Sequence, residues 1–234
     1  MPAVGSFFKS KNNIATFIAI LFHATGFLGI VWGNTALFAS LTAMNMLLMF
    51  GLTLYTQGID HWSFYFFVLL CAATGYIVEY AGVHTAILFG DYAYGNTLGI
   101  QYRNIPLIIG INWFIIVYCC GISIYTLTAL VKKRLLPEQR STYEKWSIAS
   151  LIIDGALLAT FFDWVMEPVA VRLHFWKWNT DGEIPMLNYI TWFAVSCCLL
   201  AVFSACKFKK ANKFVIHLLL IQFMFFLLLR TFLL

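Results

Sequence analysis

The apolar run IPLIIGINWFIIVYCCGISIYTLTALV, residues 105–131, decides the fold, because none of its 27 positions carries a charged side chain. A helix needs about 20 mostly apolar residues to cross the hydrocarbon core of a membrane. The run is therefore predicted to be a membrane-spanning helix. Pro106 suits its first turn, where the missing N–H would have no partner within the helix.

Six further runs of the same kind flank this one. They cover residues 13–33, 35–56, 63–83, 147–168, 187–206 and 212–233. Together they predict an all-α, polytopic membrane bundle of about seven transmembrane helices, and one integral membrane domain over residues 1–234. Pro168 is expected to end the run 147–168.

The overall composition excludes a water-soluble protein. Hydrophobic residues make up 62% of the chain, charged residues 11%, and the mean hydropathy is +0.83. Soluble domains carry about 25% charged residues. The net charge of +5 does not indicate nucleic-acid binding, because most basic residues lie in short loops between apolar runs.

The basic residues predict the orientation of the chain. Cytoplasmic loops of membrane proteins are rich in Lys and Arg. With the N-terminus in the cytoplasm, eleven of the 15 basic residues fall on the cytoplasmic side. They are Lys9, Lys11, Lys132, Lys133, Arg134, Arg140, Lys145, Lys207, Lys209, Lys210 and Lys213. We therefore expect a cytoplasmic N-terminus in a multi-pass protein of the cell inner membrane.

No metal or cofactor is predicted. The six cysteines form no CxxC pair, and two loop histidines, His84 and His174, belong to no compact ligand motif. The chain also lacks a glycine-rich phosphate loop, a GxSxG elbow and an HExxH motif.

Carboxylates at membrane depth are the main candidates for chemistry, because charged groups are costly there. Glu79 and Asp163 each lie roughly 16 residues into an outward-running helix, so we expect them at equal depth. Glu167 follows Asp163 by four residues and shares its helix face. Asp91 follows in a loop. A carboxyl group in apolar surroundings favours its neutral form, and two together can divide the roles of acid and base.

A structural role is the alternative for these carboxylates, with Arg103, Arg172 or Arg230 as ion-pair partners. Asp154 and His217 lie at similar depth nearer the cytoplasm, and we expect them to form a structural contact.

Three uncharged side chains, His23, Asn45 and Gln222, fall near the middle of the bilayer. We expect them to be hydrogen-bond partners between helices.

One internal echo is present. Glu79 precedes Tyr92-Ala93-Tyr94 by 13 residues, and Asp163 precedes Trp176-Lys177-Trp178 by the same 13. Both stretches begin on helices that run outward, so the echo predicts a parallel repeat. A chance match is the alternative.

The same stretches carry a family resemblance. The first contains EYAGVHT (79–85), FGDYAY (89–94) and NWF (112–114), and the second contains DWVMEPVA (163–170), FWKW (175–178) and NYITW (188–192). Over residues 75–195 the chain resembles the membrane carotenoid-biosynthesis family that includes carotenoid 1',2'-hydratases and bisanhydrobacterioruberin hydratases. It departs at Glu167, where many members have Asp, and at Thr191, where Gly is usual.

The resemblance implies that water is added to the terminal double bond of an acyclic carotenoid, without a cofactor. The expected catalytic residues are Glu79, Asp163, Glu167 and Asp91. The expected substrate-binding residues are Tyr80, Tyr92, Tyr94, Trp113, Trp176, Trp178, Asn188 and Trp192. The implied partners are a carotenoid within the bilayer, water and other carotenoid enzymes, with no nucleic acid.

In the expected mechanism, protonated Asp163 or Glu79 gives its proton to the alkene, and the partner carboxylate deprotonates the attacking water. Aromatic faces stabilise the intervening cation. A lycopene-type cyclase is the nearest alternative, in which an internal double bond captures the same cation. A non-catalytic transporter or scaffold is the other, although no obvious inverted repeat supports a transporter.

Overall fold

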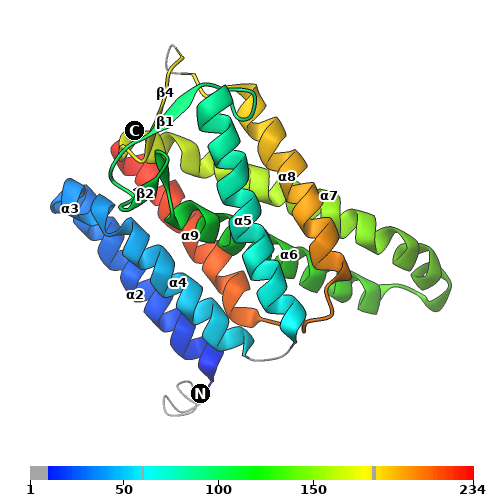
Figure 1. The fold of residues 1–234 in the computed structure, drawn as a ribbon. Coiled ribbons are helices and arrows are strands. Elements are labelled where there is room, and N and C mark those ends of the chain that lie inside the picture. The colour runs from blue at the N-terminus through cyan, green and yellow to red at the C-terminus, as the bar shows by residue number, and fades with distance from the viewer. Residues whose placement is uncertain (1–9, 59–60, 181–182) are drawn as a thin grey trace.

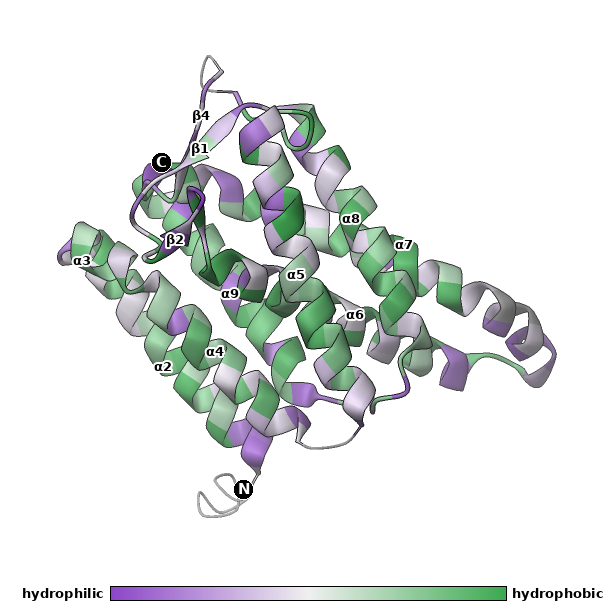
Figure 2. Cartoon of the chain, in the orientation of Figure 1, coloured by the Kyte–Doolittle hydropathy of each residue, from purple (hydrophilic) through white to green (hydrophobic). Residues whose placement is uncertain are grey.

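The computed structural model describes residues 10–58, 61–180 and 183–234 and has the predicted all-α, polytopic membrane architecture (Figure 1). Its helices are α2 (Lys11–Trp32), α3 (Thr35–Ser40), α4 (Thr42–Gln57), α5 (Trp62–Thr85), α6 (Ile108–Arg134), α7 (Pro137–Arg172), α8 (Met186–Ala205) and α9 (Lys213–Leu233). Among the described residues, six of these are long and apolar enough to cross a membrane. Figure 2 shows that apolar residues predominate along these helices, whereas the end of α7 near the α6–α7 connection is hydrophilic.

The run 35–56 differs from the expected single span, because α3 and α4 divide it at Leu41. The Ser40 hydroxyl donates to the Leu37 carbonyl at 2.8 Å, next to this break. Side-chain hydrogen bonds of this kind compete with the helical backbone and often bend helices. Neither α3 nor α4 reaches the length of a spanning helix, so the count of seven stays a prediction.

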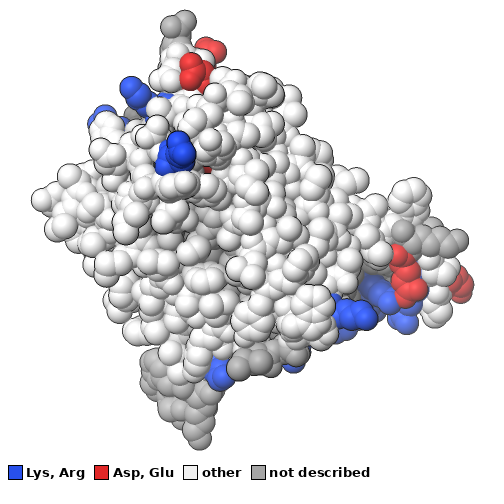
Figure 3. All heavy atoms as spheres, viewed as in Figure 1, with Lys and Arg blue, Asp and Glu red and all other residues white. Residues whose placement is uncertain are grey.

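Charged residues gather at opposite ends of the bundle. On the face shown in Figure 3, a broad band without charges separates them, as expected for a protein surrounded by lipid. The end near the N-terminus carries the α6–α7 and α8–α9 connections with their basic residues (Figure 1). Lys9 lies outside the described residues. The cytoplasmic placement of this end stays a prediction.

Helix α6, formed by the central apolar run, is the core of the bundle. From Ile108 to Ile122 every residue except Ile111 is buried. A helix that is buried on all sides needs no polar face, which explains the uninterrupted apolar sequence.

Small residues let α5 approach α6 closely. A Cβ atom at Gly75 would lie 2.6 Å from the Trp113 side chain, and one at Gly110 would lie 2.6 Å from the Ala72 carbonyl oxygen. Glycines commonly allow such approaches between membrane helices. Gly75 therefore sets the position of Trp113.

Replacing Gly110 with Ala is expected to lower the thermal unfolding temperature of the detergent-solubilised protein, because the methyl group would force two backbones apart. Overpacking typically costs about 1–3 kcal/mol. Gly51→Ala is the matched control, since nothing lies within 4 Å of its added Cβ. Equal unfolding temperatures for the two variants would contradict the close packing of α5 and α6.

Two sequence predictions about α7 are wrong. Pro168 does not end the helix, which continues to Arg172 because buried Val169 and Ala170 hold the next turn in the core. Asp154 does not contact His217: it accepts a hydrogen bond from Ser150, and His217 shares one with Thr16 at 2.9 Å. Equal depth in the membrane did not bring those two residues together.

Two small antiparallel sheets cover the end of the bundle opposite the N-terminus (Figure 1). Strand β1 (Tyr92–Tyr94) pairs with β4 (Trp176–Trp178), with Ala93 opposite Lys177. Strand β2 (Gln101–Tyr102) pairs with β3 (Ile105–Pro106). Their turn residues, Arg103 and Asn104, both have positive φ, as a two-residue hairpin turn requires.

Candidate active site

Glu79, near the end of α5, accepts three hydrogen bonds although it is only 5% exposed. The hydroxyl groups of Tyr92 and Tyr94 donate to Oε2 at 2.5 and 2.7 Å. The indole Nε1 of Trp113 donates to Oε1 at 3.0 Å. Both oxygen atoms of this buried carboxyl group are therefore satisfied by donors.

Glu167, on α7, has a parallel arrangement. The indole nitrogens of Trp176 and Trp178 donate to Oε2 at 3.0 and 3.1 Å. The Asn188 side-chain amide lies 3.4 Å from Oε1. Glu167 is also buried.

The β1–β4 ladder positions these aromatic donors. Its register places Tyr92 opposite Trp178 and Tyr94 opposite Trp176. Alternate residues of a strand point to the same face of a sheet. One face of the sheet therefore directs two phenols to Glu79 and two indoles to Glu167.

The phenols of Tyr92 and Tyr94 are expected to keep their protons. Burial raises the pKa of each hydroxyl group above its usual range, and the neighbouring charge of Glu79 raises the pKa further. Both groups therefore act as donors to Glu79.

Asp163 lies one helical turn before Glu167 and is 1% exposed. The Asn188 amide donates to its Oδ2 at 2.7 Å. Its Oδ1 is buried and has no hydrogen-bond partner among the described residues. Asn188 thus contacts both carboxyl groups of α7, and one oxygen atom of Asp163 is left free.

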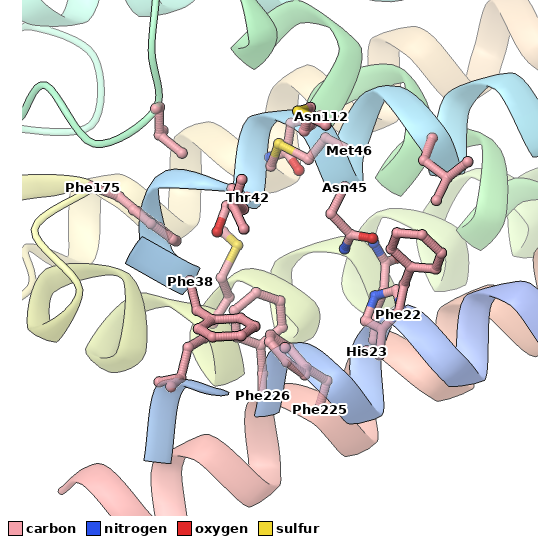
Figure 4. Close-up of a pocket in the computed structure, with 18 of the residues that line it drawn as sticks. Phe22, His23, Phe38, Thr42, Asn45, Met46, Asn112, Phe175, Phe225 and Phe226 are labelled. Atoms are coloured by element: carbon pink, nitrogen blue, oxygen red, sulfur yellow. The ribbon is translucent and has the colours of Figure 1, made fainter. Parts of the chain in front are cut away.

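Two cavities meet at these residues. A small one of about 20 Å³ is lined by Glu79, Asp163 and Glu167, and has room for about one water molecule. A larger, mostly apolar chamber of about 410 Å³ lies between α2, α4, α6, α7 and α9 (Figure 4). Four residues line both cavities: Ile109, Asn112, Met166 and Trp176. An apolar chain in the chamber would therefore lie next to the carboxylates.

The indole of Trp192 forms another wall of the small cavity and stacks on the indole of Trp113. The rings of Trp113 and Trp192 lie 3.9 Å apart, with 10° between their planes. Trp192 lines the cavity, while Trp113 also holds Glu79. Aromatic faces of this kind attract cations.

The ion-pair alternative for the carboxylates is wrong. Among the described residues, the ion pair found joins Lys132 and Glu144, at the α6–α7 connection. Arg230 lies 4.5 Å over the ring of Trp164 instead. The buried carboxylates are thus held by neutral donors, and none of them forms an ion pair with a described Lys or Arg.

The structure separates two predicted site residues from the others. Tyr80 is 41% exposed on the outer face of α5 and stacks on His84. It follows the buried Glu79 directly, and adjacent residues of a helix point in different directions. Asp91 precedes β1 and is exposed, where the Asn179 amide donates to it at 2.8 Å. Neither residue lines the small cavity. Asp91, expected to be catalytic, therefore lies apart from the other three carboxylates.

His23, Asn45 and Gln222 were expected to form hydrogen bonds between helices, and this prediction is also wrong. Asn45 Oδ1 and Gln222 Oε1 are buried without a hydrogen-bond partner among the described residues, and both side chains line the chamber. His23 bonds the Ala19 carbonyl of its own helix at 2.8 Å. Asn112, which lines both cavities, was not predicted as a site residue, although its amide stands out in an apolar run.

Replacing Tyr94 with Phe is expected to reduce product formation about tenfold, since Glu79 loses one donor. A hydrogen bond to a charged group contributes about 1.5–3 kcal/mol. The measurement is the rate of the reaction catalysed at this cluster, in membranes with equal amounts of protein. Tyr80→Phe is the control, because that hydroxyl lies outside the cluster, and an equal loss in both variants would contradict the assignment.

The two stretches of the internal echo have a similar order of elements. The first forms α5–β1–α6, with β2 and β3 inserted before α6, and the second forms α7–β4–α8. The parallel repeat itself stays a prediction. Strands β1 and β4 pair with each other. The spacing in the sequence pairs Glu79 with Asp163, but the hydrogen bonds pair Glu79 with Glu167. Each of these two glutamates is held by the aromatic side chains of the strand that follows its helix.

The fold and site define a polytopic membrane protein with a buried carboxylate cluster beside an apolar chamber. The chain matches the carotenoid biosynthesis protein family over residues 33–234 and belongs to that family. The match supports a role in carotenoid biosynthesis. No curated protein and no solved structure matched the chain.

Proposed function

We propose that this protein is a carotenoid hydratase, which adds water to the terminal double bond of an acyclic carotenoid end group to give a tertiary alcohol. Family membership supports the carotenoid as substrate. The observation that carries the proposal is the free Oδ1 of Asp163. It belongs to a buried carboxyl group beside a cavity the size of one water molecule.

The hydrogen bonds favour Asp163 as the acid. Glu79 and Glu167 accept only from N–H and O–H donors, which complement the ionised form of a carboxyl group. A third negative charge between them would be repelled by both. The Oδ1 atom of Asp163 accepts no hydrogen bond. We therefore assign the proton to Asp163.

In the proposed reaction, the Asp163 proton and the electron pair of the double bond form a C–H bond at the less substituted carbon. The other carbon becomes a tertiary cation. A lone pair of the water oxygen forms the C–O bond, and Glu167 takes one proton from that water. Glu167 then returns this proton to Asp163, so that one water is added and both groups recover their starting states.

The cation is stabilised by charge and by aromatic faces. We assign Glu79 the ionised form, because its three donors complement a carboxylate, and its negative charge would then offset the positive carbon. Trp192 lines the cavity, and its aromatic ring would attract the cation. Both groups are in place before the reaction, so little reorganisation is needed.

The chamber is proposed to hold the isoprenoid end group. The end group would reach the carboxylates past the four residues that line both cavities. Met166 in this wall has a flexible side chain that can adjust to the chain. The substrate would enter from the bilayer of the inner membrane, where other carotenoid enzymes supply it. Addition of water changes no overall oxidation level, so the proposed reaction needs no redox cofactor.

Pigment analysis by mass tests the proposal. The protein is expressed in cells that accumulate lycopene or gamma-carotene, and cells with the empty vector are the control. A product heavier by one water is the expected result. Isomers of unchanged mass with cyclic end groups would favour a cyclase instead, and unchanged pigment with both substrates would contradict the proposal for these end groups.

A further inference from the structure

One imidazole and three amide side chains, from four different helices, line the apolar chamber. They are His23 on α2, Asn45 on α4, Asn112 on α6 and Gln222 on α9. Figure 4 shows His23, Asn45 and Asn112 around this cavity. We call these four residues the chamber polar set.

Hydrogen-bonding capacity in the chamber polar set is unused. Asn45 Oδ1 and Gln222 Oε1 are buried and accept no hydrogen bond from the described residues. His23 Nδ1 lies 2.8 Å from the Ala19 carbonyl, which can only accept, so Nδ1 carries the proton and Nε2 is an acceptor. The Asn112 side chain is buried, and no hydrogen bond joins it to another described residue.

A hydrocarbon cannot satisfy these atoms. Buried polar groups without partners are destabilising, and native proteins commonly pair them with ordered water. A buried water needs two to four polar partners and about 10–15 Å³ of space. The chamber of about 410 Å³ provides the space, and the chamber polar set provides the partners.

We infer that the chamber polar set is a water-binding site within the membrane that resupplies the small cavity beside Asp163. Each turnover of the proposed reaction consumes one water, and the small cavity has room for about one. Asn112 lines both cavities, so water bound there lies next to the carboxylates. The inference rests on the proposed hydratase function.

The inference concerns the fate of the cation. With water present, the cation forms its C–O bond and the product is the alcohol. Without water, a C–H bond next to the cationic carbon breaks instead. Its electron pair restores a double bond, and the proton passes to Glu167. In D₂O this second outcome leaves deuterium from Asp163 in a pigment of otherwise unchanged composition.

The test uses two variants, Asn45→Leu and Gln222→Met, which keep the side-chain size and remove the acceptor oxygen. Thr53→Val on α4 is the matched control, because its buried hydroxyl donates to the Met49 carbonyl of its own helix at 2.8 Å. The substrate is lycopene, which carries no hydroxyl group. The readouts are the ratio of alcohol to unhydrated pigment, deuterium in the recovered pigment, and the thermal unfolding temperature in detergent.

The expected result is an alcohol ratio at least about tenfold lower in both variants, with more deuterium in the recovered pigment and an unfolding temperature no lower than that of the wild type. Thr53→Val should match the wild type. An unchanged ratio with lycopene in both variants would overturn the water site. A wild type that forms no alcohol at all would instead contradict the proposed function.

Discussion

Replacing Asp163 with Asn is expected to abolish most hydration, because the amide cannot supply the proton that starts the reaction. General acid catalysis typically contributes about 10²–10⁴-fold, and we expect a loss in this range. Asn has almost the same shape as Asp, and Asn188 can turn its amide to keep a hydrogen bond at Oδ2. The measurement is the initial rate of alcohol formation in membranes with equal amounts of protein.

Asp154→Asn is the matched control for this prediction. Asp154 lies on the same helix, but it is exposed and accepts from Ser150. This variant should hydrate the substrate at the wild-type rate. If Asp163→Asn kept full turnover, Asp163 would not be the acid, and Glu79→Gln would then be the next variant to measure.

Replacing Glu167 with Gln is expected to lower alcohol formation about 100-fold, because the attacking water loses the base that takes its proton. Gln can turn its carbonyl oxygen toward the indole nitrogens of Trp176 and Trp178, so the fold should be preserved. The measurements are the rate of alcohol formation and the thermal unfolding temperature. The variant should form far less alcohol and unfold at the normal temperature.

Glu144→Gln is the control for this variant, since Glu144 lies on α7 at the α6–α7 connection and pairs with Lys132. It should leave the rate unchanged. Normal hydration by Glu167→Gln would assign the base to Glu79, whose hydrogen-bonded cluster lies across the same cavity.

The membrane architecture could be predicted from the sequence because transfer into lipid depends mainly on the length and hydrophobicity of each run. The seven runs all correspond to helices in the structure. The exception, the division of 35–56 into α3 and α4, is a local change of the backbone at Leu41, which hydrophobicity does not encode. The continuation of α7 past Pro168 depends on burial of the next turn.

The three clustered carboxylates were identifiable for a related reason: charge inside a membrane is costly enough to be informative at single positions. The separation of four residues placed Asp163 and Glu167 on one helix face. No such rule could place the side chains of Asp91 and Tyr80. The direction of the Asp91 side chain depends on how β1 starts, and that of Tyr80 depends on which face of α5 meets α6.

The sequence by itself determined the all-α membrane class, the helical runs and the identity of the buried carboxylates. Only the tertiary structure decided that Tyr92 and Tyr94 hold Glu79 while Trp176 and Trp178 hold Glu167, and that Asp163 Oδ1 is left free. It also decided that Asn45 and Gln222 face a chamber instead of each other's helices. The physical reason is that hydrogen bonds need the right distance and direction, and here they join residues on different helices and strands. Hydrophobicity, in contrast, is a property of each segment alone.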